Sequence, residues 1–94
     1  MTAIVLDAMI ECNRTLEQAR RDFAAGRITS AALLRVPMSR NQWTLQLLGA
    51  KGDSGMLLAV PSLDTHIFTS LDQAVETMEL IGLQVEQLTV RHAR

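Results

Sequence analysis

The feature that most constrains the fold is a glycine-rich connector, "GAKGDSG", at residues 49–55. Glycine and aspartate favour the tight-turn backbone conformations that most other residues avoid. Apolar runs stand on both sides of the connector, "WTLQLL" at residues 43–48 and "MLLAV" at residues 56–60, and Pro61 ends the second run. Two short apolar runs joined by a turn-rich connector predict a β-hairpin.

The segment that leads into this hairpin, residues 30–49, fits two different structures. As a helix, it would place Trp43 and Leu47 on one face and Leu45 well away from them. As a strand, it would place all three side chains on one face, with polar residues between them. The alternation therefore favours a strand that begins near Gln42.

The competing interpretation of the same segment is a DNA-binding helix-turn-helix over residues 30–48. Its first element would be a single helical turn over residues 31–34, capped by Thr29 or Ser30 and ended before Pro37. Its second helix would have to bury one apolar stripe and expose base-reading side chains. Because the leucines do not fall on one such stripe, we prefer the hairpin and keep the helix-turn-helix as the alternative.

Residues 4–24 have the periodicity of one long amphipathic helix, and Gly26 follows as a left-handed residue that would end it. Acidic residues stand toward its start and arginines toward its end, as the helix dipole favours. Apolar residues recur at spacings of 4, 3, 4, 3 and 4 and would form one stripe, made of Val5, Met9, Cys12, Leu16, Ala19 and Phe23.

A second helix is predicted after Ser70, which forms a capping-box pattern with Gln73. Gly82 would end that helix, and "LQVEQLTV" at residues 83–90 has the β-branched content of a last strand. A brief extended piece is expected before the helix, at residues 66–68. The apolar stripe of the helix follows the 3.6-residue period and consists of Leu71, Ala74, Val75, Met78 and Ile81.

These elements define an α+β fold with the order α-β-β-(β)-α-β, in which the bracketed strand is the brief extended piece. A chain of 94 residues, 48% of them apolar and 20% charged, suits one packed globular domain, residues 1–94. We expect a small, mainly antiparallel sheet backed by the two helices.

Cys12 is the one cysteine of the sequence, which excludes an internal disulfide and fits a reducing compartment. The amino end has no basic stretch, and Asp7 interrupts its apolar run, so we expect no secretory signal. No apolar segment approaches the ~20 residues that would span a bilayer. We therefore expect a soluble, cytoplasmic protein.

The residues that could carry chemistry do not form a catalytic or metal-binding pattern. Cys12 lies inside the apolar stripe of the first helix, where a thiol is usually inert. His66 and His92 have no second histidine or cysteine at metal-ligand spacing. The run Asp64–His66 has no nucleophile motif beside it, and residues 49–55 lack the spacing of a phosphate-binding loop. We expect a protein without enzymatic activity, metal or cofactor.

Charge is divided unevenly along the chain, whose net charge is −1. Residues 1–50 carry six arginines and four acidic residues, whereas residues 51–94 carry three basic and six acidic residues. Neither half is as basic as non-specific phosphate binding requires. Under the DNA-binding alternative, the phosphate contacts would come from Arg20, Arg21, Arg27, Arg35 and Arg40.

Trp43 with its alternating leucines, followed by "FTSLDQAVETMELIG" at residues 68–82, resembles a segment of small accessory proteins encoded in plasmid maintenance, partition or transfer regions. The resemblance covers roughly residues 43–82 and carries no catalytic residue onto this chain. It implies a bacterial mobile element and a regulatory module that binds a protein partner. The matching positions are Phe68, Ser70, Leu71, Asp72, Ala74 and Gly82.

The length of the first helix predicts self-association. About 21 helical residues at ~1.5 Å rise reach ~30 Å, whereas strands of five or six residues span only ~17–20 Å. A sheet that small would leave part of the apolar stripe uncovered, and a two-fold homodimer would bury it. Alternatively, a short helix near residues 31–35 and the second helix would cover the whole stripe within the monomer.

Overall fold

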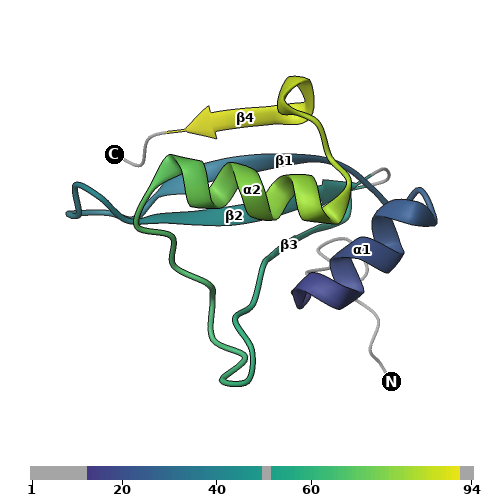
Figure 1. The fold of residues 1–94 in the computed structure, drawn as a ribbon, viewed down its shortest axis with the longest axis horizontal. Helices are drawn as coiled ribbons and strands as arrows, with labels where there is room; N and C mark the ends of the chain where they lie inside the picture. The colour runs from purple at the N-terminus through teal and green to yellow at the C-terminus, as the bar shows by residue number, and fades with distance from the viewer. Residues whose placement is uncertain (1–12, 50–51, 92–94) are drawn as a thin grey trace, which may run out of the picture.

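The computed structural model describes residues 13–49 and 52–91 of the chain (Figure 1). These residues form two α-helices, a short 3₁₀ helix and four strands, so the α+β class predicted from the sequence is confirmed. In chain order the elements are α1 (Leu16–Ala24), β1 (Ile28–Arg35), β2 (Trp43–Gly49), β3 (Ser54–Met56), α2 (Leu71–Ile81), η3 (Val85–Gln87) and β4 (Leu88–Arg91).

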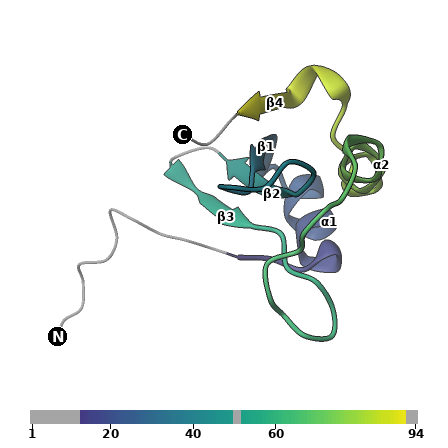
Figure 2. The same cartoon turned by 90° about the vertical axis from the view of Figure 1, so that its left-hand side faces the viewer.

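The four strands form one mixed sheet in the order β3-β2-β1-β4. β1 and β2 pair antiparallel, as do β2 and β3, whereas β4 runs parallel to β1. Both helices lie on the same side of this sheet, as Figure 1 and Figure 2 show. The opposite face of the sheet is covered by no helix of the described residues (Figure 2).

The core lies between the helices and one face of the sheet, and most of its side chains are aliphatic. β2 supplies Trp43, Leu45 and Leu47 to this core, whereas its intervening side chains on the other face are half-buried. This alternation confirms the strand interpretation of the segment before the connector. The other buried members of the core are Ala19, Ile28, Ala31, Leu33, Leu57, Phe68, Ala74, Met78, Ile81 and Leu83.

β1 occupies the residues for which the sequence suggested a turn of helix. Residues 28–35 pair antiparallel with β2, with Leu33 opposite Leu45. Both arms of residues 30–48 are therefore strands, and a helix-turn-helix at these residues is wrong. Alanine and leucine favour helices in isolation, but pairing with β2 and burial beneath the helices override that weak preference.

The hairpin predicted across the glycine-rich connector is confirmed, because β3 pairs antiparallel with β2, with Leu47 opposite Gly55. β3 ends at Met56, whereas the sequence suggested a strand that continues to Val60. The next residues, Leu57 and Leu58, form single β-bridges to segments outside the four strands. The apolar run is thus shared between the sheet and the loop that follows it.

α1 begins at Leu16, so the predicted continuous helix over residues 4–24 is wrong. Thr15 is extended, at φ −77° and ψ 170°. Its hydroxyl accepts a hydrogen bond from Gln18 N at 3.3 Å, and the Gln18 side chain accepts one from Thr15 N at 3.0 Å. This reciprocal capping box starts a helix, whereas the apolar periodicity of the sequence continues across it without a break. Residues 4–12 lie outside the described part of the chain.

The glycines predicted to end the two helices do so. Gly26 follows α1 at φ +81°, and Gly82 follows α2 at φ +119°. At the start of α2 the Ser70 hydroxyl accepts a hydrogen bond from Gln73 N at 3.1 Å, which is the Ser70 half of the predicted capping box. The Gln73 side chain accepts a hydrogen bond from Thr69 Oγ1 at 3.4 Å instead. Both ends of α2 are therefore fixed by its own terminal residues.

β4 begins later than the strand predicted over residues 83–90. Leu83 is buried in the core, and residues 85–87 form η3 before the strand begins at Leu88. β4 then lies parallel to β1, with Leu88 opposite Ala31, which places the last strand at an edge of the sheet. No helix within the described ranges is long and apolar enough to cross a membrane.

Candidate functional site

The loop between β3 and α2 projects away from the sheet as a narrow finger, residues 57–68 (Figure 1). Backbone hydrogen bonds join its two arms. Ala59 N donates to Asp64 O at 2.8 Å, and His66 N donates to Leu57 O at 2.9 Å. These bonds hold the arms together and give the finger a defined shape.

Two large apolar side chains stand at the tip of the finger. Val60 is 67% exposed and Leu63 is 57% exposed. Leu63 has φ +64°, a left-handed conformation that leucine rarely adopts. Exposed apolar side chains on a supported loop, with backbone strain at one of them, are typical of a contact surface.

The base of the finger is fixed to the sheet. His66 stacks on Phe68, with ring centroids 4.2 Å apart and an interplanar angle of 7°. Phe68 is buried and exchanges two backbone hydrogen bonds with Trp43, at 2.8 and 2.9 Å. A fixed base lowers the conformational entropy that the tip would lose on binding a partner.

A mostly apolar groove of about 370 Å³ lies between the finger, the start of α1 and α2. Leu57 and Leu58 from the finger and Leu16 from α1 supply its apolar walls, and Thr77 lines it from α2. Its lining within the described residues includes the acidic Glu17 and no lysine or arginine. The groove can therefore take an apolar segment, with a negative charge at its border.

The turn between β1 and β2, residues 36–42, forms a second projection at one end of the sheet (Figure 1). The guanidinium of Arg35 lies 5.4 Å from the centre of the Trp43 ring and donates through Nη2 to Arg40 O at 2.6 Å. Met38, at φ +62°, is fully exposed. This turn presents the cation of Arg40 beside the exposed apolar side chains of Pro37 and Met38.

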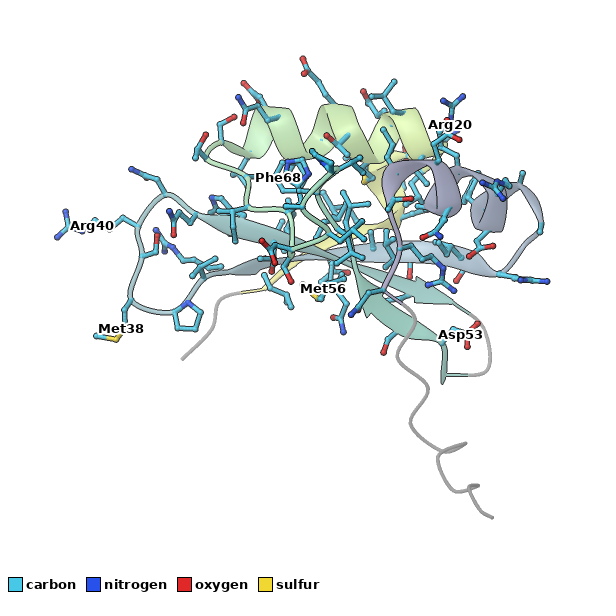
Figure 3. All side chains as sticks on the ribbon, turned by 90° about the horizontal axis from the view of Figure 1, so that it is seen from below. Arg20, Met38, Arg40, Asp53, Met56 and Phe68 are labelled. Atoms are coloured by element: carbon cyan, nitrogen blue, oxygen red, sulfur yellow. The ribbon has the colours of Figure 1, made fainter. Side chains whose placement is uncertain are left out.

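The five arginines considered for DNA binding fall into two groups. Arg20, Arg21 and Arg27 are exposed on α1 or shortly after it. Arg35 is the last residue of β1, and Arg40 lies in the turn that follows it. Figure 3 shows Arg20 and Arg40 at opposite ends of the molecule. The structure therefore does not bring the five side chains into one basic surface.

The apolar stripe predicted for self-association is interrupted where α1 starts. Leu16 and Phe23 are half-buried and Ala19 is fully buried, and all three pack into the core of their own chain. α1 has nine residues, so the argument that a ~30 Å helix extends beyond the sheet does not apply to it. The other members of the stripe, Val5, Met9 and Cys12, lie outside the described residues.

The sequence reasoning missed a buried cation, Arg14. Its side chain is 4% exposed, and its Nε lies 2.5 Å from Asp22 Oδ2. Its backbone is also held, because Arg14 N donates to Met56 O and Leu58 N donates to Arg14 O. Arg14 thus ties α1 to the end of β3. A helix over residues 4–24 would place Arg14 inside the helix. Arg14 lies before α1 only because the helix begins at Leu16.

The histidine and acidic side chains of residues 13–49 and 52–91 form no cluster that could hold a metal ion. Asp64 and Thr65 are exposed on the finger, and the ring of His66 is stacked on Phe68.

Comparisons of the chain with models of protein families, with curated proteins and with solved structures found no match. The resemblance to plasmid accessory proteins stays a prediction from the sequence.

Proposed function

We propose that this protein is a small, non-enzymatic binding module that holds another protein through the finger and the groove at its base. The observation that carries the proposal is the exposure of Val60 and Leu63 at the tip of a loop with a fixed base. Burying one such side chain typically contributes about 1.5–3 kcal/mol. A polar residue at either position would leave the core intact, so a contact outside the chain best explains the apolar choice.

The groove defines the chemistry of the partner. Its walls are apolar, its charged lining residue is Glu17, and Asp64 is exposed on the adjoining arm of the finger. An apolar segment flanked by lysine or arginine complements both properties. We therefore expect the partner to present an amphipathic, basic segment.

In the context that the sequence resemblance implies, this module is a regulatory accessory protein of a plasmid or other mobile element, acts in the cytoplasm and works as a homodimer. A DNA-binding regulator is the weaker alternative. The helix-turn-helix that it required is replaced by β1 and β2, and the arginines that it used are divided between two ends of the molecule.

The test compares variants of the finger with a matched control on α2. Val60→Ser and Leu63→Ser remove the apolar contacts of the tip, whereas Leu80→Ser removes a similarly exposed leucine, 59% exposed, from the helix. Because all three positions are exposed, we expect each variant to fold like the wild type.

A photo-crosslinking amino acid at position 63 or position 80 then reports which surface is occupied in extracts of the native host. We expect a discrete crosslinked protein from position 63 and none from position 80. Val60→Ser should reduce the product from position 63 at least about tenfold. Equal crosslinking from both positions, or a product that Val60→Ser leaves unchanged, contradicts the proposal.

A further inference from the structure

The face of the sheet that points away from the helices carries no charged residue on β1, β2 or β3, and β4 places Arg91 opposite Leu34 at the edge of the sheet. The alternation of the three strands places every second residue on this face. Its half-buried members include Leu34, Thr44, Gln46, Leu48, Ser54 and Met56. No helix of the described residues covers them (Figure 2).

This composition is unusual for a sheet face that only meets water. The solvent side of an antiparallel sheet normally alternates polar and charged residues with the buried ones. In a chain that is 20% charged, the face instead carries Leu34, Leu48 and Met56 together with uncharged polar residues. The face therefore has the character of a contact surface.

We propose that a second copy of this chain covers the uncharged face, so that two sheets pack against each other about a two-fold axis. The inference rests on the homodimer of the proposed function and assigns its interface to the sheet. In a two-fold contact the same residues of both copies meet near the axis. Charged residues there would bring like charges together, which an uncharged face avoids.

The arrangement of large and small side chains on the face supports self-association. Leu48 has Ser30 and Ser54 as its partners on the two neighbouring strands, and Leu34 lies opposite Thr44. Large side chains thus stand beside small ones at these positions, whereas Met56 lies opposite Gln46 and Ala32 is fully buried. Two such faces can interdigitate, with a leucine of one copy above small residues of the other, as in packed sheets ~10 Å apart.

The size of the face predicts a weak dimer. β1, β2 and β3 have eight, seven and three residues, and each residue occupies about 16 Å² of sheet at ~3.4 Å along the strand and ~4.8 Å between strands. The flat contact is then roughly 300 Å² per copy, or ~600 Å² in total, and interdigitation adds to the buried area. Stable standard-size interfaces bury ~1,200–2,000 Å². We therefore expect the dimer to form only at micromolar concentration.

Substitutions to lysine at the centre of the face test the proposal. Gln46→Lys introduces a charge with little change in side-chain length, and Leu48→Lys is the second variant. Gln73→Lys makes the same change on α2, on the helix side of the sheet, and is the matched control. Circular dichroism and chemical denaturation show whether each variant folds.

Sedimentation equilibrium from low to high micromolar concentration then gives the mass. We expect wild type and Gln73→Lys to reach the mass of two chains, and both face variants to stay folded with a dissociation constant raised at least about tenfold. Wild type with the mass of one chain at high micromolar concentration overturns the homodimer and the interface together. If wild type has the mass of one chain and Leu48→Lys also lowers the free energy of unfolding, residues of the same chain cover the face.

A wild-type dimer that Gln46→Lys and Leu48→Lys leave unchanged overturns the interface alone. The binding function of the finger is tested separately, because Val60 and Leu63 lie outside the face. If Val60→Ser loses the crosslinked partner but keeps the mass of two chains, both proposals stand. If no partner is crosslinked but the face variants dissociate the dimer, only the function of the finger fails.

Discussion

Arg14 lies buried at the junction of α1 and β3, and Asp22 is its acidic partner. The side chains of Arg14 and Asp22 are 4% and 22% exposed. Asp22→Ala removes that carboxylate from a cation which water barely reaches, and breaking a buried ion pair costs about 3–5 kcal/mol. Because Asp22 keeps some exposure, we expect a loss near the lower end, about 3 kcal/mol, in the free energy of unfolding measured by chemical denaturation.

The control for this prediction is Glu17→Ala, which removes an exposed acid from the first turn of the same helix. An exposed acidic residue in the first turn contributes through the helix dipole and through neighbouring surface charges, so the loss should stay below about 1 kcal/mol. Similar losses for the two variants would mean that the ion pair contributes no more than a surface charge.

Gly82 ends α2 at the point where this helix meets α1. It has φ +119°, and a Cβ atom at this position would lie 2.7 Å from Cδ2 and Cε2 of Phe23. Gly82→Ala should therefore strain the backbone and displace the ring, with a loss of about 2–3 kcal/mol in the free energy of unfolding. Gly26 also has a positive φ, but nothing lies within 4 Å of the position of an added Cβ atom. Gly26→Ala should therefore lower the free energy of unfolding by only about 1 kcal/mol.

A double-mutant cycle separates the two causes. In a Phe23→Ala background the contact is absent, so Gly82→Ala should lose no more than Gly26→Ala does. If Gly82→Ala loses the same free energy with and without the Phe23 ring, the contact between the helices contributes nothing to the effect.

At the scale of the elements, the sequence predicted those whose signals lie within their own residues. Ser70 and Gly82 mark the two ends of α2, and both have the predicted conformation. β2 shows the strict alternation of a strand that is buried on one face, and it forms that strand. Local capping and periodicity are visible in a single sequence because their physical causes are local.

The elements that the sequence missed take their structure from distant partners. β1 looked like a turn of helix, yet it is the strand between β2 and β4, and its pairing determines its conformation. The finger was missed for a related reason. Its apolar run was interpreted as a buried strand, but Leu57 enters the core while Val60 points into water. Periodicity alone does not distinguish these two environments.

The effect of Thr15→Ala on the free energy of unfolding has opposite signs for a helix that begins at Leu16 and for one helix over residues 4–24. If Thr15 caps a helix that begins at Leu16, Thr15→Ala should lower the free energy of unfolding by about 1 kcal/mol. If residues 4–24 formed one helix, the same change inside it would be neutral or stabilising, because alanine is the better helix former. Thr77→Ala, inside α2, is the control and should stabilise slightly. Thermal and chemical unfolding both measure the difference.

At the scale of the whole molecule, the candidate surfaces lie in different places. The finger projects to one side, the turn with Arg40 forms one end, and the uncharged face lies opposite the helices (Figure 1 and Figure 2). A dimer through the sheet would therefore leave both fingers accessible. Two accessible fingers allow bivalent binding, which raises the apparent affinity for a partner that presents two segments.

Because the arginines are divided between two ends of the molecule, we expect weak binding to nucleic acid. Either end offers only two or three of the arginines Arg20, Arg21, Arg27, Arg35 and Arg40, and the net charge of the chain is −1. Each phosphate contact contributes about −0.9 to the slope of log binding constant against log salt, so the slope for random duplex DNA should be no steeper than about −3. We expect negligible binding at physiological salt, measured by fluorescence anisotropy across a salt series.

Tight binding with a slope beyond about −5 would require many simultaneous phosphate contacts and would favour the DNA-binding regulator. Arg40→Ala and Arg20→Ala would then show which end of the molecule makes those contacts, because each lost contact flattens the slope by about one.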